Sequence, residues 1–343
     1  MSNATASLTP PDHSDHYGRP TFLSLISGEV LRLRSRRLVK VVLAAALVLV
    51  ALVMVIVAFT TGTPSAAERA TAQSLADENY AQCLQSVAGD PGVPQDASPQ
   101  DLCGGQDASL YLAKQPFDFA DSYPNTVIAF AVGVALLLFL IGASAGGAEW
   151  SARTMPALLY WEPRRRRVMG AKIAVLAGFA VALSVAAQVL ALAVVWLLSL
   201  LRGSNPAVPL PDDFWVDALG TAGRGAILAV LVVLGGFALA NLTRNTGAAL
   251  GIAFVYFAII ENLVGGVLPR FARWSVAFNV GGLLNPGGID GVPTGVKTSV
   301  EDSVGLLAST MSISNARGGL VLTLIVVAFL AVATILFTRR DVT

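Results

Sequence analysis

Residues 38–60 read LVKVVLAAALVLVALVMVIVAFT, an apolar run in which the one charged residue, Lys40, stands near the start. A helix must contribute about 20 apolar residues to cross a hydrocarbon core of roughly 30 Å. The run is long enough for this, so it predicts a membrane-spanning helix and indicates the class of the whole chain.

Apolar runs of similar length recur along the rest of the chain. They occupy residues 126–147, 170–201, 223–242, 247–268 and 318–337. As a helix, the run at 170–201 would extend to roughly 48 Å at about 1.5 Å per residue, so we expect it to project beyond the bilayer. We therefore predict an all-α integral membrane protein with six transmembrane helices in a domain of residues 38–343.

The composition agrees with this class. Of the 343 residues, 55% are hydrophobic and 13% are charged, whereas about a quarter of the residues in a soluble domain are charged. The net charge is +1, which gives no indication of a nucleic-acid partner. Most of the surface is therefore expected to face membrane lipid or protein rather than water.

The distribution of Lys and Arg predicts the orientation, because basic residues near the ends of spans stay in the cytoplasm. With the N-terminus inside, 15 of the 23 basic residues fall on the cytoplasmic side. They are Arg19, Arg32, Arg34, Arg36, Arg37, Lys40, Arg153, Arg164, Arg165, Arg166, Arg167, Lys172, Arg244, Arg339 and Arg340. The 62–125 loop holds only Arg69 and Lys114 against nine acidic residues. We therefore expect a multi-pass plasma-membrane protein with both termini cytoplasmic.

The segments outside the six runs differ in character. Residues 1–20 are rich in Pro, Ser, His and Asp, which predicts a disordered cytoplasmic tail. Residues 21–37 place apolar side chains at helical spacing before a basic cluster, which predicts an interfacial amphipathic helix; a simple extension of the first span is the alternative. Residues 269–317 are expected to form an outer re-entrant or interfacial segment, with short helices followed by an irregular loop at NPGGIDGVPTG.

The 62–125 loop is expected to form a small extracytoplasmic subdomain, and it contains both cysteines of the chain, Cys83 and Cys103. On the oxidising side of the membrane they would close a loop of about 20 residues, and such a disulfide stabilises a small domain by roughly 3 kcal/mol. Two unpaired thiols are the alternative. The cysteines do not form a CxxC pair, so we expect no metal site.

The sequence lacks the common catalytic motifs. It contains no GxxxxGK[ST] loop for ATP, no GxSxG elbow and no HExxH pair, and both histidines, His13 and His16, lie in the tail. We therefore expect a protein that is not an enzyme and that holds no cofactor of its own.

The loop between the second and third spans, residues 148–169, carries the most informative pattern. With its flanks, residues 147–172, it reads GAEWSARTMPALLYWEPRRRRVMGAK. Leu158 and Leu159 fall on one face of a short predicted helix, which Pro163 and the arginines end. A helix with an apolar face and a basic end can dock a cytosolic partner or lie on lipid.

This segment resembles ABC transporter permeases of the type-2 exporter class. The residues that carry the resemblance, in their order along the chain, are Glu149, Thr154, Leu158, Leu159, Pro163, Arg166 and, at the next span, Lys172. Six spans, an amphipathic N-terminal helix and the short turn LTRNTG between the fourth and fifth spans extend it. Two residues depart from the family: Arg153 stands where Gly is common, and Pro156 is expected to interrupt the helix early.

The resemblance implies a coupling helix that receives the force of ATP hydrolysis from a separate ABC ATPase subunit, which would carry ATP and Mg²⁺. Six spans are half of such a transporter, so two permease chains would pair; identical halves are the simpler assumption, and a heteromeric pair is the alternative. The implied function is export of a substrate that the sequence does not identify. The alternative for residues 150–165 is a solvated basic loop that serves only topology.

Three polar residues in the spans are candidates for a substrate path, namely Gln188, Glu261 and Asn262. A carboxylate within a span is costly, so Glu261 is a candidate for cation binding or proton relay. Its alternative is an interfacial carboxylate that pairs with Arg270 or is hydrated at the headgroups. Two rival functions therefore stand beside export: an ion-coupled secondary transporter, and a stand-alone immunity or sensory anchor.

One run of small residues, GASAGG at 142–147, predicts a close approach between helices. Contacts between subunits are one use that we consider for it.

Overall fold

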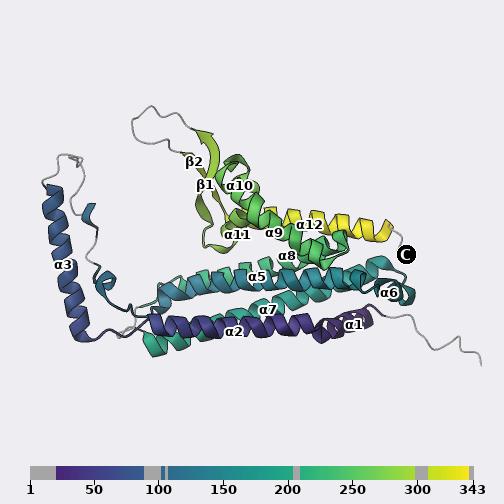
Figure 1. Ribbon diagram of the computed structural model, residues 1–343, viewed down its shortest axis with the longest axis horizontal. Helices are drawn as coiled ribbons and strands as arrows, with labels where there is room; N and C mark the ends of the chain where they lie inside the picture. The colour runs from purple at the N-terminus through teal and green to yellow at the C-terminus, as the bar shows by residue number, and fades with distance from the viewer. Residues whose placement is uncertain (1–20, 89–101, 105–106, 204–208, 298–307, 340–343) are drawn as a thin grey trace, which may run out of the picture.

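The computed structural model describes residues 21–88, 102–104, 107–203, 209–297 and 308–339. The predicted disordered tail at 1–20 lies outside the described residues. Most of the described chain is helical (Figure 1).

Six helices are long and apolar enough to cross a membrane, which confirms the prediction of a helical membrane protein with six candidate spans. They are α2 (Arg37–Thr60), α5 (Phe119–Ser151), α7 (Arg165–Arg202), α8 (Phe214–Thr243), the helix Thr246–Val264 and α12 (Asn315–Arg339). The fifth consists of α9 (Thr246–Val255), a π-helical turn η2 (Tyr256–Ile260) and the start of α10 (Glu261–Gly266).

Several helices continue past the apolar runs, because a helix ends at its caps rather than at the membrane edge. Asp118, for example, caps α5 by accepting a hydrogen bond from the backbone of Ala120.

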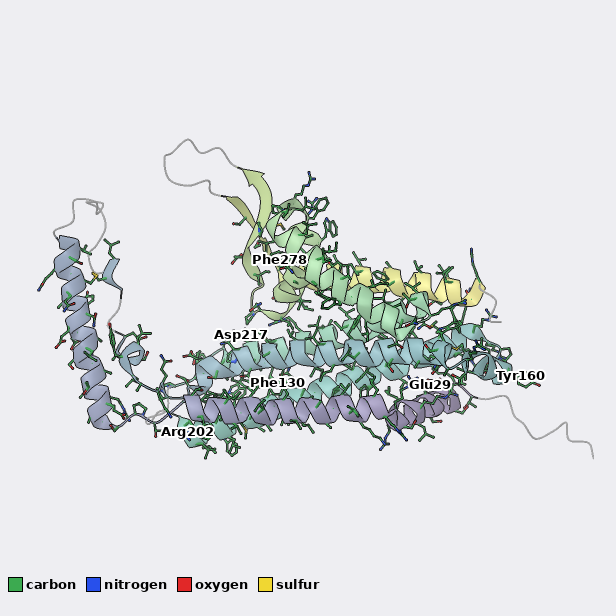
Figure 2. All side chains as sticks on the ribbon, in the orientation of Figure 1. Glu29, Phe130, Tyr160, Arg202, Asp217 and Phe278 are labelled. Atoms are coloured by element: carbon green, nitrogen blue, oxygen red, sulfur yellow. A yellow bond between two sulfur atoms is a disulfide. The ribbon has the colours of Figure 1, made fainter. Side chains whose placement is uncertain are left out.

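The helices α2, α5, α7 and α8 lie side by side along the length of the molecule (Figure 1). Helices α1 (Phe22–Ser35) and α6 (Met155–Trp161) and the C-terminal end of α12 lie together at one end, which we call the basic end. Helix α3 (Ala66–Ala88) lies at the other end, called the opposite end. In Figure 2, Glu29 and Tyr160 mark the basic end, and Arg202 lies toward the opposite end.

Helix α1 is separate from the first span. It ends before Arg36, whose backbone is extended, with φ −64° and ψ 122°. Thr21 caps its start by accepting a hydrogen bond from the backbone of Ser24. The segment is therefore a distinct helix and not a continuous extension of α2.

Helices α5 and α8 make the closest helix contact, and glycines allow it. A Cβ atom added to Gly142 would lie 2.1 Å from the carbonyl oxygen of Val233, and one on Gly146 would lie 2.6 Å from that of Phe237. Small residues let two helix backbones approach in this way. The GASAGG run is thus packed inside the chain, which confirms the predicted close approach between helices.

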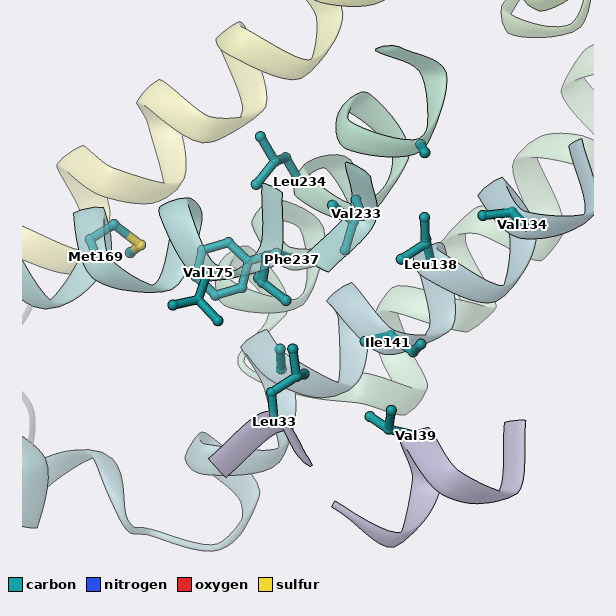
Figure 3. Close-up of a cluster of buried hydrophobic side chains, with 14 of the residues drawn as sticks. Leu33, Val39, Val134, Leu138, Ile141, Met169, Val175, Val233, Leu234 and Phe237 are labelled. Carbon is teal, nitrogen blue, oxygen red and sulfur yellow. The ribbon is translucent and has the colours of Figure 1, made fainter. Parts of the chain in front are cut away.

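The main core lies between these helices. Leu138 and Ile141 of α5 pack with Val233 and Phe237 of α8, and all four side chains are buried (Figure 3). By contrast, none of the most apolar stretch of α2 is buried within the chain. Apolar side chains on the outside are expected of a membrane protein, because lipid tails or another chain cover them.

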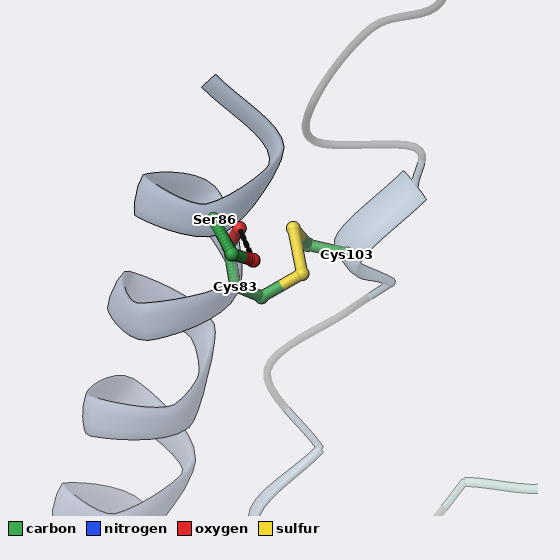
Figure 4. The surroundings of a disulfide bond; sticks show 3 residues. All are labelled: Cys83, Ser86 and Cys103. Carbon is green, nitrogen blue, oxygen red and sulfur yellow. Dashed lines mark hydrogen bonds between the residues drawn. A yellow bond between two sulfur atoms is a disulfide. The ribbon is translucent and has the colours of Figure 1, made fainter. Parts of the chain in front are cut away.

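The opposite end carries a small disulfide-linked unit. It contains α3 (Ala66–Ala88) and a 3₁₀ turn η1 (Ala108–Tyr111). Cys83 and Cys103 form a disulfide with Cα atoms 5.7 Å apart, which confirms the predicted pair (Figure 4). Glu68 caps α3 by accepting a hydrogen bond from the backbone of Ser65 at 2.7 Å, and this bond lowers the pKa of the Glu68 carboxyl below its usual value.

The segment before α12 differs from the sequence prediction in one respect. It contains η3 (Pro269–Trp274), α11 (Val276–Leu284) and an antiparallel hairpin of β1 (Ile289–Lys297) and β2 (Ala308–Ile313). The prediction of an irregular loop at NPGGIDGVPTG is therefore wrong for the residues in β1. The strand forms because Val292 and Ile313 are buried side chains of one small cluster with Ala272.

Candidate functional site

The link between α5 and α7 turns sharply at the basic end. Arg153 has a positive φ of 54°, the left-handed region that favours glycine, so the conformation explains why Gly suits this position. Pro156 lies in the first turn of α6. A backbone N–H at this position has no acceptor within the helix, so a proline, which has no N–H, costs no hydrogen bond there. The expectation that Pro156 interrupts the helix is therefore wrong, because the helix begins only at Met155.

The apolar side of α6 packs against its own chain. Met155 is 2% exposed, and Leu158 and Leu159 contact the main core. Tyr160, in contrast, is 86% exposed. The two leucines therefore fix α6 to the bundle, and the side of the helix that carries Tyr160 faces outward.

Glu149 and Lys172 meet where α5 ends and α7 begins. The Lys172 ammonium donates to Oε1 of Glu149 at 2.8 Å and to both carboxylate oxygens of Glu29 at 3.0 Å. The three side chains are between 5% and 12% exposed. One lysine thus joins α1, α5 and α7.

Arg36, the residue between α1 and α2, adds a second cation. Its guanidinium donates to Oε1 of Glu149 at 3.2 Å and to the backbone oxygen of Ser144 at 2.9 Å. Arg32 pairs with Glu29 at the more exposed edge. We call Glu29, Arg36, Glu149 and Lys172 the basic-end network. Because these charges are largely withdrawn from water, removing one partner should be far more harmful than removing a surface ion pair.

The arginine run that follows α6 has several distinct contacts. Arg165 donates to the backbone oxygen of Phe337 at 3.1 Å, at the C-terminal end of α12. Arg167 lies 3.8 Å from the buried carboxylate of Glu162. Pro163 and Arg166 are exposed. The run therefore includes structural contacts as well as surface charge.

The turn between α8 and α9 joins the same end of the molecule. The Arg244 guanidinium lies over the Trp150 ring, 4.5 Å from its centroid. The Trp150 indole N–H donates to the Asn241 side chain at 3.3 Å. Thr154 precedes α6, and its backbone N–H donates to the Glu149 carbonyl at 3.0 Å. The end of α8 and the turn that follows it therefore hold the start of the link in place.

The candidate path residues have local roles in the structure. Glu261 accepts hydrogen bonds from the Ser275 hydroxyl at 2.5 Å and from the backbone of Val276 at 2.7 Å, so it caps the start of α11. Asn262 donates to carbonyls of its own helix, at 3.1 Å to Ala258. Gln188 donates to the Val127 carbonyl at 3.2 Å, and its buried Oε1 has no partner among the described residues. The described contacts do not join Gln188 to the other two.

Glu261 thus has a role that sequence reasoning did not propose. Neither a pair with Arg270 nor a free intramembrane carboxylate describes it, because its oxygens accept from the first turn of α11. Glu29 and Arg36 were also absent from the predicted site. A carboxylate within the amphipathic 21–37 segment was the only signal, and nothing in the sequence joined it to Lys172.

Among the described residues, no group of three or more His, Cys, Asp or Glu side chains could hold a metal ion. No protein-family model, curated protein or solved structure matches the chain.

Proposed function

We propose that this chain is the membrane subunit of an ATP-driven ABC exporter and works with a separate ATPase subunit that binds ATP and Mg²⁺. The observation that carries the proposal is the basic-end network, in which Glu149 and Lys172 fix both ends of the α6 link to the bundle and to α1. An element held at both ends in this way is suited to pass the movement of a bound partner to the spans.

The orientation in this proposal places the basic end in the cytoplasm. Helices α1 and α6, the start of α9 and the C-terminal end of α12 lie at that end, and the disulfide-linked unit lies at the other (Figure 1). The distribution of charges supports this orientation, because Lys and Arg near the ends of spans mark the cytoplasmic side.

Contacts inside the chain could carry a movement of α6 to the membrane-spanning helices. Met155, Leu158 and Leu159 pack on the main core, so a shift of α6 would act directly on α5 and α7. Arg165 extends the connection to the end of α12. The exposed side around Tyr160 is the surface that we propose for the ATPase.

We further propose that two copies of the chain assemble around a shared path. The most apolar stretches of α2 and of the fifth span are almost wholly unburied within one chain. These surfaces leave room for a second copy as well as for lipid. Glu261 adds no support for an ion-coupled transporter, because it is occupied as a helix cap.

The test is recovery of an ABC ATPase with the affinity-tagged chain from its native membranes, with the bound protein identified by mass spectrometry. We expect Tyr160→Asp to reduce the recovered ATPase by about tenfold or more, since a central interface residue contributes roughly 2 kcal/mol. Leu110→Asp is the matched control, because Leu110 is 71% exposed in η1 at the opposite end.

Both variants should keep the wild-type thermal stability, because the two side chains are exposed. An ATPase absent from the wild-type preparation would contradict the proposed function. Equal recovery with Tyr160→Asp and wild type would exclude the Tyr160 surface as the docking site.

A further inference from the structure

An apolar groove runs along α12 and opens at the basic end. It has a volume of about 400 Å³, and its wall is formed by residues of α12 between Val327 and Thr338 together with Arg166 at the start of α7. Most of the wall is aliphatic, with Ala331 near its middle. The groove is shallow and open toward the outside of the bundle, as a surface that faces lipid should be.

The length of the groove matches one leaflet of a bilayer. From Val327 to Thr338 the helix advances by roughly 16 Å at about 1.5 Å per residue. This is about half of a hydrocarbon core of roughly 30 Å. The wall belongs to a helix that is long and apolar enough to span the membrane, so the groove lies at the depth of acyl chains.

Arg166 provides a positive charge at the polar end of the groove. Its neighbours in the first turn of α7 are engaged, because Arg165 donates to the carbonyls of α12 and Arg167 pairs with Glu162. Arg166 is exposed, and no hydrogen bond or ion pair joins its side chain to another of the described residues. Its guanidinium is therefore available to an anion at the membrane surface.

We propose that this groove binds an anionic phospholipid, with one acyl chain along α12 and a headgroup phosphate oxygen accepting hydrogen bonds from Arg166. The apolar wall selects a lipid over a soluble anion, and the arginine selects an anionic headgroup over a zwitterionic one. The proposal requires only that α12 spans the membrane and does not depend on an ATPase partner.

The experiment measures lipid binding by the full chain in phosphatidylcholine nanodiscs with increasing fractions of phosphatidylglycerol. Native mass spectrometry of the released protein counts the retained lipids of each kind. We expect wild type to retain phosphatidylglycerol preferentially, and Arg166→Gln to weaken this binding about fivefold, as loss of roughly 1 kcal/mol for one basic residue implies. Arg164→Gln is the matched control, because Arg164 is exposed and does not line the groove.

A second pair of variants tests the groove itself. Ala331→Trp should fill it and abolish preferential retention, whereas Val332→Trp should not, because Val332 is 49% exposed at the same depth but lies outside the wall. Equal retention by Arg166→Gln and wild type would overturn the proposal, as would equal weakening by Arg164→Gln. If Ala331→Trp altered the oligomeric state and left lipid retention unchanged, the occupant would be a second copy and the lipid proposal would be wrong.

Discussion

Lys172 is a lysine whose ammonium group lies between two carboxylates, with 5% of its side chain exposed. Replacement by Met keeps most of the side-chain volume but leaves Glu29 and Glu149 with less compensation of their charge. Breaking a buried ion pair on one side costs roughly 3–5 kcal/mol. Because Arg36 and Arg32 still contact the carboxylates, we expect Lys172→Met to destabilise the protein by about 3 kcal/mol, measured as a lower Tm of the purified chain.

Two controls separate the network from a general effect of charge. Arg32→Gln should change the Tm little, because the Arg32 side chain is 48% exposed and exposed ion pairs contribute roughly 0–1 kcal/mol. Adding Glu29→Gln to Lys172→Met should recover part of the stability, since it removes one uncompensated charge. A double variant as unstable as the sum of its single changes would show that the two residues are not coupled.

At the scale of single residues, the sequence identified several important residues but did not predict their contacts. Glu149 and Lys172 were found because they frame a recognisable loop, but their partner Glu29 lies 143 residues from Lys172. A contact between residues so far apart in the chain cannot be recognised from one sequence alone. Glu261 was identified as unusual from its position in a span, whereas its bonds to Ser275 and Val276 depend on a fold that brings α11 against α10.

At the scale of helices and strands, the contact between α5 and α8 is the one most sensitive to a small increase in side-chain size. A methyl group at Gly142 would lie 2.1 Å from a backbone oxygen of α8, so the helices would have to separate. Gly133 lies in the same helix with no other atom within 4 Å of an added Cβ. We expect Gly142→Ala to lower stability by at least about 2 kcal/mol, in the range of overpacked cores.

Gly133→Ala should be neutral or stabilising by up to about 1 kcal/mol, because alanine favours a helix over glycine. Size-exclusion chromatography after heating compares the two variants in one detergent. If Gly142→Ala is as stable as Gly133→Ala, the close approach of α5 and α8 does not exist in the folded protein.

Element by element, the apolar runs predicted the helices well and the hairpin poorly. A span of about 20 apolar residues is a strong signal, because every backbone polar group in lipid must be paired inside its own helix. The strand β1 contains Gly291 and Pro293, which are typical of turns, and its partner β2 begins only at Ala308. The burial of Val292 and Ile313, which holds the strands together, follows from tertiary contacts alone.

Over the whole molecule, the two ends differ in charge and chemistry, and the disulfide lies at the end opposite the network (Figures 1 and 4). The Lys and Arg distribution indicated this asymmetry from the sequence, but the arrangement of helices around the core required the structure. Which end faces the cytoplasm is decided when the chain is inserted into a membrane. The orientation is therefore tested by thiol labelling of the chain in intact cells.

Cys83 and Cys103 provide that test, because they are the only cysteines in the chain. If the basic end is cytoplasmic, the disulfide lies outside, in an oxidising compartment where it persists. A membrane-impermeant maleimide added to intact cells should then leave the chain unlabelled, and addition of a reductant should make both thiols react. The same treatment of a Cys83→Ser, Cys103→Ser chain gives the background. Labelling that required permeabilised cells after reduction would place the unit in the cytoplasm and reverse the proposed orientation, and with it the side on which an ATPase could dock.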